Sequence, residues 1–285
     1  HDGDVDYRIG HIKFDGDVEI TGDVCSRFRV EASGNVVVHG SVERGAKVLA
    51  KGDLAVSSGV IGARIKCGGD FFSIYVQESK VNVGSEMRVT NYITDSKVVV
   101  GGNAIITDNR AKNPLNLSGG ELSVSQNLDV PSMGSVNNRE TLVRVGVKPE
   151  MEDRLSRYRE GIAFCNLRSR QASRLVETLI GQNFTPDTLK KAIRKSPEGR
   201  RKVLLARLSE IRKLKKLRNS LEFHIKGIVT TQRDGFAQVK IKVRRSVYPR
   251  VKICFGELEF MTVTELAKGQ FRLNDVNGPI HYVED

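Results

Sequence analysis

The chain has 285 residues, of which 39% are hydrophobic and 28% are charged, with a formal net charge of +12, 27 glycines and no tryptophan. This composition is sufficient for one or two hydrophobic cores and excludes a disordered chain. No segment approaches the roughly 18 uncharged apolar residues of a membrane helix, and the acidic start at residues 1–4 does not resemble a secretory signal, so we expect a cytoplasmic protein.

Charge and glycine divide the chain into three segments, which we predict to be residues 1–148, 149–222 and 223–285. The first segment has 17 basic residues (Lys and Arg) and 18 acidic residues (Asp and Glu), the second has 19 and 9, and the third has 10 and 7. The second segment therefore carries +10 of the net +12. Glycine is distributed in the opposite way, with 19 of the 27 in the first segment and only 3 in the second.

The first segment contains an internal repeat. Apolar residues recur every six positions at Ile12, Val18, Val24, Val30, Val36, Val42, Val48, Leu54 and Val60. A glycine followed by Asp or Asn separates many pairs of short apolar runs, at steps of 16 to 18 residues: Gly16, Gly34, Gly52, Gly69, Gly102 and Gly120, with Ser85 replacing one glycine. We expect each glycine to mark a corner where a positive φ is tolerated.

A repeat of this length without a helix cannot bury its apolar side alone and must stack on the next repeat. The first segment is therefore predicted to be a parallel β-helix of about three short strands per turn. An antiparallel sandwich usually has longer strands and irregular turn spacing. The left-handed helix of hexapeptide acyltransferases has its glycine directly after the inward aliphatic residue, whereas here the glycine lies two residues before it. Spacing alone does not determine the handedness.

The second segment is predicted to be a basic coiled-coil helical hairpin that protrudes from the rod. Pro149 can occupy a first helical turn, and apolar or small residues follow at alternating steps of three and four. The first seam consists of Met151, Leu155, Tyr158, Ile162, Cys165, Ser169, Ala172, Val176 and Leu179, and the second of Leu204, Leu208, Ile211, Leu214, Leu217 and Leu221. A short helix carrying Leu189 and Ile193 should lie between the two long ones.

The third helix and its approach are rich in cations, which we predict to form a partner-binding surface. They are Arg194, Lys195, Arg200, Arg201, Lys202, Arg207, Arg212, Lys213, Lys215, Lys216 and Arg218. The alternative is that these cations simply form the solvated face of a coiled coil. Their excess over acidic residues nevertheless favours an anionic partner, first of all an acidic protein. Nucleic acid is less favoured because residues 194–218 contain no aromatic side chain for base stacking. Binding to a membrane surface is possible but less favoured, because the apolar seam is needed inside the hairpin and is not available to lipid.

The third segment returns to a period of two, from Ile225 onward. We expect its strands to rejoin the rod and to cap it, ending in a hairpin over residues 271–282 that turns at Asn277 and Gly278. A cap matters because an open last turn exposes unpaired backbone groups that promote end-to-end association.

The sequence predicts neither catalysis nor a cofactor or metal. Nucleophile, P-loop, dinucleotide-binding and zinc-protease motifs are absent from the sequence, and its cysteines and histidines are scattered. His39 is more readily explained as a surface histidine than as an acyltransferase base. The corner acids Asp17, Asp53 and Asp70, with Asn35 and Asn103, form a ladder that could take calcium, but Asp and Asn are ordinary corner residues.

Two stretches resemble the flagellar assembly protein A family: residues 5–18, which read VDYRIGHIKFDGDV, and residues 247–253, which read VYPRVKI. The rungs and the inserted helices agree with this family, although bactofilin-type proteins have similar rungs. The resemblance implies a bacterial, non-enzymatic protein with a right-handed β-helix, usually preceded by a further domain, that acts in flagellar assembly, at the cell pole in polarly flagellated bacteria. The family often has glycine where Arg250 stands.

The fold predicted from all three segments is mainly β with an α insertion: a parallel β-helix plus a long antiparallel helical hairpin. Our leading hypothesis is a scaffold that binds an acidic regulatory or flagellar-assembly protein through its basic hairpin. The alternatives are a filament former, in which rods stack end to end as a homo-oligomer, and a β-helix enzyme, either an acyltransferase or a polysaccharide-cleaving enzyme.

Overall fold

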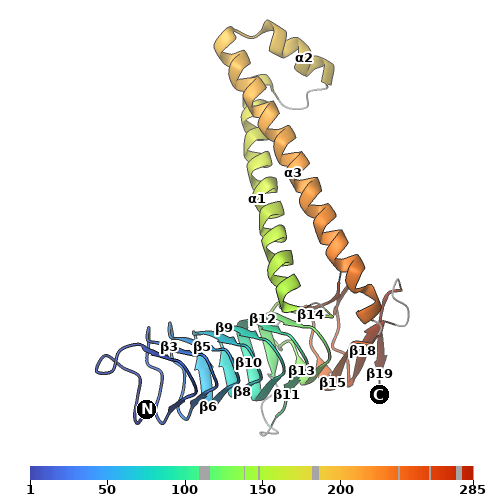
Figure 1. Cartoon of the computed structure of the whole chain (residues 1–285). Helices are drawn as coiled ribbons and strands as arrows, with labels where there is room; N and C mark the ends of the chain where they lie inside the picture. Colours follow the sequence, from blue (N-terminus) through green and yellow to red (C-terminus); the bar gives the residue numbers. More distant parts are fainter. Residues whose placement is uncertain are drawn as a thin grey trace. The chain divides into compact units, whose positions relative to one another are not determined.

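The computed structural model describes residues 1–108, 116–137, 139–146, 148–181, 186–236, 238–256, 258–273 and 278–284. It contains two compact units. The solenoid unit comprises residues 1–152 and 232–285, and the helical unit comprises residues 153–231. Figure 1 traces the chain through both units in sequence colours, and each unit is described here by itself.

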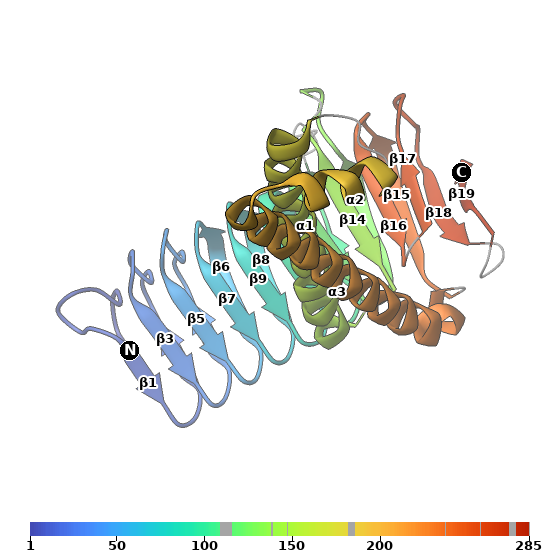
Figure 2. The same cartoon turned by 90° about the horizontal axis from the view of Figure 1, so that it is seen from above.

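The solenoid unit is a parallel β-helix, as the repeat predicts, and its strands stack from one turn to the next (Figure 2). The strands are β1 (Ile12–Phe14), β2 (Val18–Ile20), β3 (Arg29–Ala32), β4 (Val36–Val38), β5 (Lys47–Ala50), β6 (Leu54–Ile61), β7 (Arg64–Cys67), β8 (Phe71–Gln77), β9 (Lys80–Val83), β10 (Met87–Val100), β11 (Ala104–Ile106), β12 (Leu117–Val124), β13 (Leu128–Met133), β14 (Thr141–Val145), β15 (Lys240–Val247), β16 (Val251–Phe255), β17 (Leu258–Met261), β18 (Gly269–Leu273) and β19 (Ile280–Glu284).

Stacking in register produces the faces of the solenoid. One face runs in parallel from β1 through β3, β5, β7, β9, β10, β12 and β14 to β16. A second face runs from β2 through β4, β6, β8, β10, β11 and β13 to β15. A third side begins with the parallel bridges from Val5 to Val24, Val42 and Val60.

The core is the column of aliphatic side chains enclosed by these faces. Of the nine apolar residues at six-residue spacing, eight are buried and only Ile12 is half-buried. Burial of one such side chain contributes on the order of 1.5 kcal/mol or more to stability. Each turn covers the apolar side of its neighbour, which is why a single turn would not fold alone.

The Gly-Asp and Gly-Asn corners form a hydrogen-bonded ladder. The side-chain oxygen of each Asp or Asn accepts the backbone N–H of the residue at the same corner of the next turn, at 2.6 Å from Asp17 to Asn35 and at 2.8 Å from Asn35 to Asp53 and from Asp53 to Asp70. The ladder continues from Asp70 to Glu86, from Asn103 to Asn127 and from Asn127 to Lys240. These oxygens therefore stabilise the stacking of turns.

The expected reason for the corner glycines is wrong at most positions. Gly34, Gly52, Gly69 and Gly102 do not have a positive φ, whereas Gly16 and Gly120 do. A Cβ added at Gly34, Gly52 or Gly69 would instead lie 2.0 to 2.2 Å from the ladder oxygen of the preceding turn. Glycine is needed at these three positions because that oxygen occupies the space of a side chain.

The left-handed backbone conformation stacks at a different corner, two residues before the strands of the first face. Its members in register are Arg27, Gly45, Gly62, Glu78, Asp95 and Gly119, with φ between 48° and 81°. Arg250 also has a positive φ, of 65°, a conformation that glycine adopts at lower cost than arginine. Residue type did not reveal this corner because half of its members are not glycine.

The chain leaves the solenoid after β14 and returns at β15. The returning strands continue the faces in parallel, since β15 pairs with β13 and β16 pairs with β14. Antiparallel strands then follow: β17 pairs with β16, β18 with β15 and β19 with β18. The expected turn residue Asn277 lies outside the described residues, whereas β18 and β19 form the antiparallel pair expected around it.

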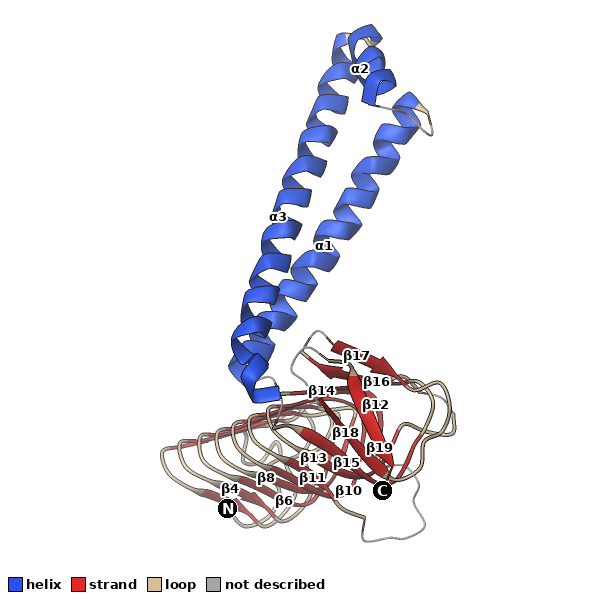
Figure 3. Ribbon diagram, turned by 90° about the vertical axis from the view of Figure 1, so that its right-hand side faces the viewer, coloured by secondary structure: helices blue, strands red, loops and turns tan. Residues whose placement is uncertain are grey.

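The helical unit contains most of α1 (Pro149–Ile180) and α3 (Glu198–Phe236), which lie side by side and antiparallel, and α2 (Pro186–Lys195) between them in sequence (Figure 3). Helix α3 continues to Phe236, well past residue 222, so the expected strand pattern from Ile225 is wrong. Ile225 and Ile228 are three residues apart, which is helical spacing.

The two long helices contact each other along part of the predicted seam. Leu155, Cys165, Ala172, Val176 and Leu204 are buried. The helices approach closely at Gly161, where an added Cβ would lie 3.0 Å from Leu221 Cδ1. Leu217, expected in the seam, is instead 50% exposed.

Candidate functional site

The eleven predicted cations define a basic surface on α2 and α3. Nine of them are exposed, and Arg207 and Arg218 are half-buried. Four cations fall within five residues of α3, at Arg212, Lys213, Lys215 and Lys216, and all four are exposed. The structure therefore gives these side chains solvent access.

Acids within the helical unit pair with only a few members of the basic surface. Lys202 lies 2.7 Å from Glu198, Arg207 lies 2.7 Å from Glu210, and Arg218 lies 3.3 Å from Glu222. Among the residues whose side chains are described, the other eight cations have no acid within ion-pair distance. Most of the positive charge on this surface is therefore not neutralised by described neighbours.

Helix α1 adds arginines that the sequence reasoning did not single out. Arg168 reaches across to α3, with a guanidinium nitrogen 3.3 Å from Glu210 Oε1. Arg170 and Arg174 are exposed on α1 and line a hollow together with Arg218 of α3. These arginines were included in the charge count of the second segment. The sequence alone does not show which face of α1 is turned toward α3, so it could not place them beside the cations of α3.

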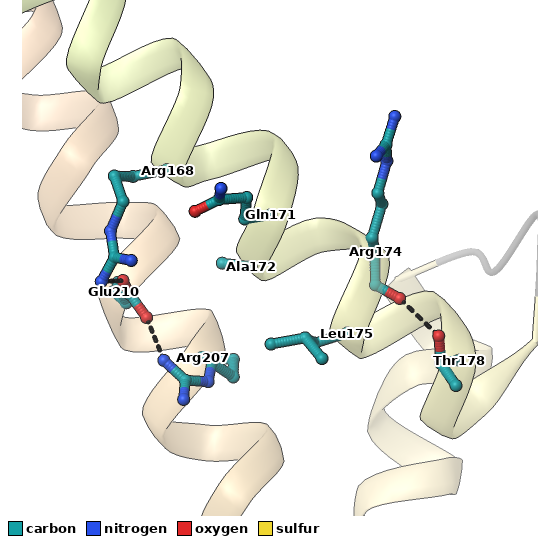
Figure 4. A pocket seen from close by; sticks show the side chains of 8 residues that line it. All are labelled: Arg168, Gln171, Ala172, Arg174, Leu175, Thr178, Arg207 and Glu210. Carbon is teal, nitrogen blue, oxygen red and sulfur yellow. Dashed lines mark hydrogen bonds and ion pairs between the residues drawn. The ribbon is translucent and has the colours of Figure 1, made fainter.

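A groove of about 450 Å³ lies between α1 and α3, and we call it the α1–α3 groove (Figure 4). It is lined by Arg168, Gln171, Ala172, Arg174, Leu175, Thr178, Arg207 and Glu210. Glu210 bridges the two helices, because its carboxylate accepts hydrogen bonds from both Arg168 and Arg207. The groove thus combines apolar surface from Leu175 with two guanidinium groups that share one carboxylate.

The solenoid residues considered for chemistry have other partners. The oxygens of Asp17, Asp53 and Asp70 accept backbone N–H groups of the next turn. His39 Nε2 lies 2.7 Å from Glu19 Oε1, with both side chains well exposed. Within the described part of the chain, no group of three or more His, Cys, Asp or Glu side chains could hold a metal ion.

Of the helices, as far as they are described, none has the length and apolar character required to cross a membrane.

Comparison with known proteins gives one match. Residues 1–278 match the family model described as the Flagellar Assembly Protein A beta solenoid domain. The match covers the solenoid strands through β18 and all three helices. Neither the curated proteins nor the solved structures gave a match to this chain.

Proposed function

Since the chain belongs to the flagellar assembly protein A family, its role lies in flagellar assembly, and we propose that it acts there as a non-enzymatic scaffold. In this proposal the helical unit binds an acidic protein partner through the basic surface. The protein acts in the cytoplasm, at the cell pole in polarly flagellated bacteria, and thereby contributes to motility. The family match confirms the resemblance predicted from residues 5–18 and 247–253.

The observation that carries the proposal is the uncompensated charge of the basic surface. Arg212, Lys213, Lys215 and Lys216 stand within about one turn and a half of helix and repel one another. An acidic partner would relieve this repulsion and would be steered to the surface over roughly the 8 Å Debye length of physiological salt. Complementary charge of this kind determines association rate and partner choice more than total affinity.

Filament formation is disfavoured by the strands at the end of the solenoid. A second rod would have to add a parallel turn to β15 and β16, but these strands pair with the antiparallel strands β18 and β17. Native sheets cover edges in this way to prevent edge-to-edge association. Sedimentation at high protein concentration distinguishes the proposals, since a filament former would show open-ended growth.

The direct test replaces Arg212, Lys213, Lys215 and Lys216 with Glu and captures partners from a flagellated bacterium at low salt. The matched control replaces four exposed solenoid cations, Lys47, Arg64, Lys66 and Lys80, with Glu. We expect the first variant to lose an acidic protein that the wild type and the control both retain. Retention of every partner by the first variant contradicts the proposal.

A further inference from the structure

Large apolar side chains are exposed on the helical unit in addition to its cations. On α1 they are Phe164 (58% exposed), Leu167 (57%) and Leu175 (49%), and on α3 they are Val203 (48%), Leu205 (48%), Leu217 (50%) and Phe223 (75%). Exposed apolar side chains scattered singly are ordinary on a protein surface, whereas those that gather on one face can contribute to a binding site. Their arrangement along the helices is therefore informative.

On α1, two of the three exposed large apolar residues align with the groove, and Leu167 does not. Phe164, Arg168, Gln171 and Leu175 stand at positions i, i+4, i+7 and i+11, which is one face of a helix. The last three of these residues line the α1–α3 groove. Phe164 therefore extends the same face by one further turn.

On α3, a matching face borders the groove from the other side. Val203, Arg207, Glu210 and Leu217 stand at positions i, i+4, i+7 and i+14. Arg207 and Glu210 line the groove, so Val203 and Leu217 lie on the face of α3 that borders it. Each helix thus places two exposed apolar side chains on this face, with the polar groups of the groove between them.

We infer that the α1–α3 groove binds an acidic amphipathic helix presented by the partner, which packs as a third helix on α1 and α3. This inference rests on the proposed function and specifies how the partner is recognised. The face from Phe164 to Leu175 spans 11 residue steps, or roughly 17 Å at 1.5 Å per step, which matches about three turns of a helix. Helix-in-groove recognition uses apolar anchors at i, i+3, i+4 and i+7 in this manner.

The charges of the groove select an acidic ligand. Arg168 and Arg207 share the single carboxylate of Glu210, so two guanidinium groups face one acid. Each guanidinium carries five N–H donors, more than Glu210 accepts, and a carboxylate on the ligand would use the remainder. In Figure 4, Arg168 of α1 and Arg207 of α3 both extend toward Glu210.

A second copy of this chain fits the groove poorly. Residues 149–222 carry 19 cations and 9 acids, so two helical units would meet with a charge of +10 each. Like charges across an interface suppress the association of wrong partners. An acidic helix brings both the apolar anchors and the opposite charge.

The test measures binding of two labelled peptides of about 21 residues, three heptads, to the full chain by fluorescence anisotropy. One peptide is an amphipathic Leu and Glu helix, and the other has the same composition in a permuted order. Val203→Asp and Leu175→Asp each place a charge on the groove. Leu205→Asp is the matched control, because Leu205 is also 48% exposed but stands two residues from Val203, on another face of α3.

We expect the amphipathic peptide to bind the wild type, and Val203→Asp and Leu175→Asp each to raise its Kd about tenfold. Leu205→Asp should change the Kd less than about twofold, with the circular dichroism of all variants unchanged. The permuted peptide should bind more weakly than the amphipathic one, because it offers the same charge without an apolar face.

Three results would overturn the inference. Equal binding of both peptides, with no effect of the groove variants, means that charge alone acts, and this leaves the proposed function intact. A dimer of the wild type that Val203→Asp dissociates in sedimentation means that a second copy occupies the groove. Failure of the amphipathic peptide to bind also rejects the groove, whereas the proposed function is contradicted when the charge-reversed surface retains its partner.

Discussion

Replacing Gly52 with alanine tests the explanation of the corner glycines. A Cβ at this position would lie 2.2 Å from Asn35 Oδ1 and 3.1 Å from the carbonyl carbon of Gly34. The Asn35 side chain must therefore move, and its 2.8 Å hydrogen bond from the Asp53 N–H is lost. The loss of one such bond costs about 1 kcal/mol, and forcing the Asn35 side chain away from its rotamer costs a similar amount.

The unfolded state offsets part of this cost, because alanine has less conformational entropy to lose than glycine, by about 0.5 kcal/mol. We therefore expect Gly52→Ala to destabilise the solenoid by about 1.5 kcal/mol. For a unit of this size the melting temperature falls by roughly 3 to 6 °C. Thermal unfolding followed by circular dichroism measures the change.

A double-mutant cycle makes the test specific. Asn35→Ala removes the obstructing oxygen, so adding Gly52→Ala to it should cost less than about 0.5 kcal/mol further. Gly102→Ala is the control, because Glu86 stands where an Asp or Asn would be and the nearest atom to an added Cβ is Ser85 O at 3.0 Å. Additive effects of Gly52→Ala and Asn35→Ala would refute the reasoning.

Three further predictions concern the solenoid. Arg27→Gly should increase the free energy of unfolding by up to about 1 kcal/mol, because glycine adopts the φ of 71° at this position without strain, and the melting temperature should rise accordingly. Arg29→Gly in β3 should lower the melting temperature. Burial raises the pKa of the Cys67 thiol to about 11, so peptide-mapped alkylation at pH 8 should leave Cys67 unmodified until the protein unfolds. The Ser85 hydroxyl and a backbone N–H lower the pKa of Asp70, so its contribution to stability is present above its unfolded pKa of about 3.9 and is lost as the pH falls through the folded value. Asp70→Asn should therefore weaken the dependence of the melting temperature on pH in that acidic range.

The fold could be predicted because the repeat has a strict physical cause. Inward residues such as Val30 and Val48 must recur at one spacing if turns are to stack, and the sequence displays that spacing directly. The role of each glycine could not be predicted, since it depends on contacts between turns. Gly52 is required by an oxygen of Asn35, whereas Arg27 adopts a left-handed conformation that its residue type does not suggest.

The charge of the helical unit could be predicted from the sequence, but which residues each helix turns toward the other could be predicted only in part. A heptad spacing places either Leu217 or Arg218 toward α1, and the apolar residue is the natural choice from sequence. The structure buries more of Arg218 than of Leu217, which leaves Leu217 on the face that borders the α1–α3 groove. The contribution of Arg168 was missed for a similar reason, because Glu210 lies 42 residues away in sequence.

The proposed contact of the basic surface with an acidic protein during flagellar assembly is tested most directly by placing a photo-crosslinking residue at Lys213 of α3 in living flagellated cells, and in a second strain at Lys66 of the solenoid. Both positions are exposed, so both can report a neighbour. We predict that an acidic protein crosslinks at Lys213 and not at Lys66, and that the crosslink disappears when Arg212, Lys215 and Lys216 are changed to Glu. Crosslinks at Lys66 alone, or at Lys213 regardless of the charge changes, would contradict the claim.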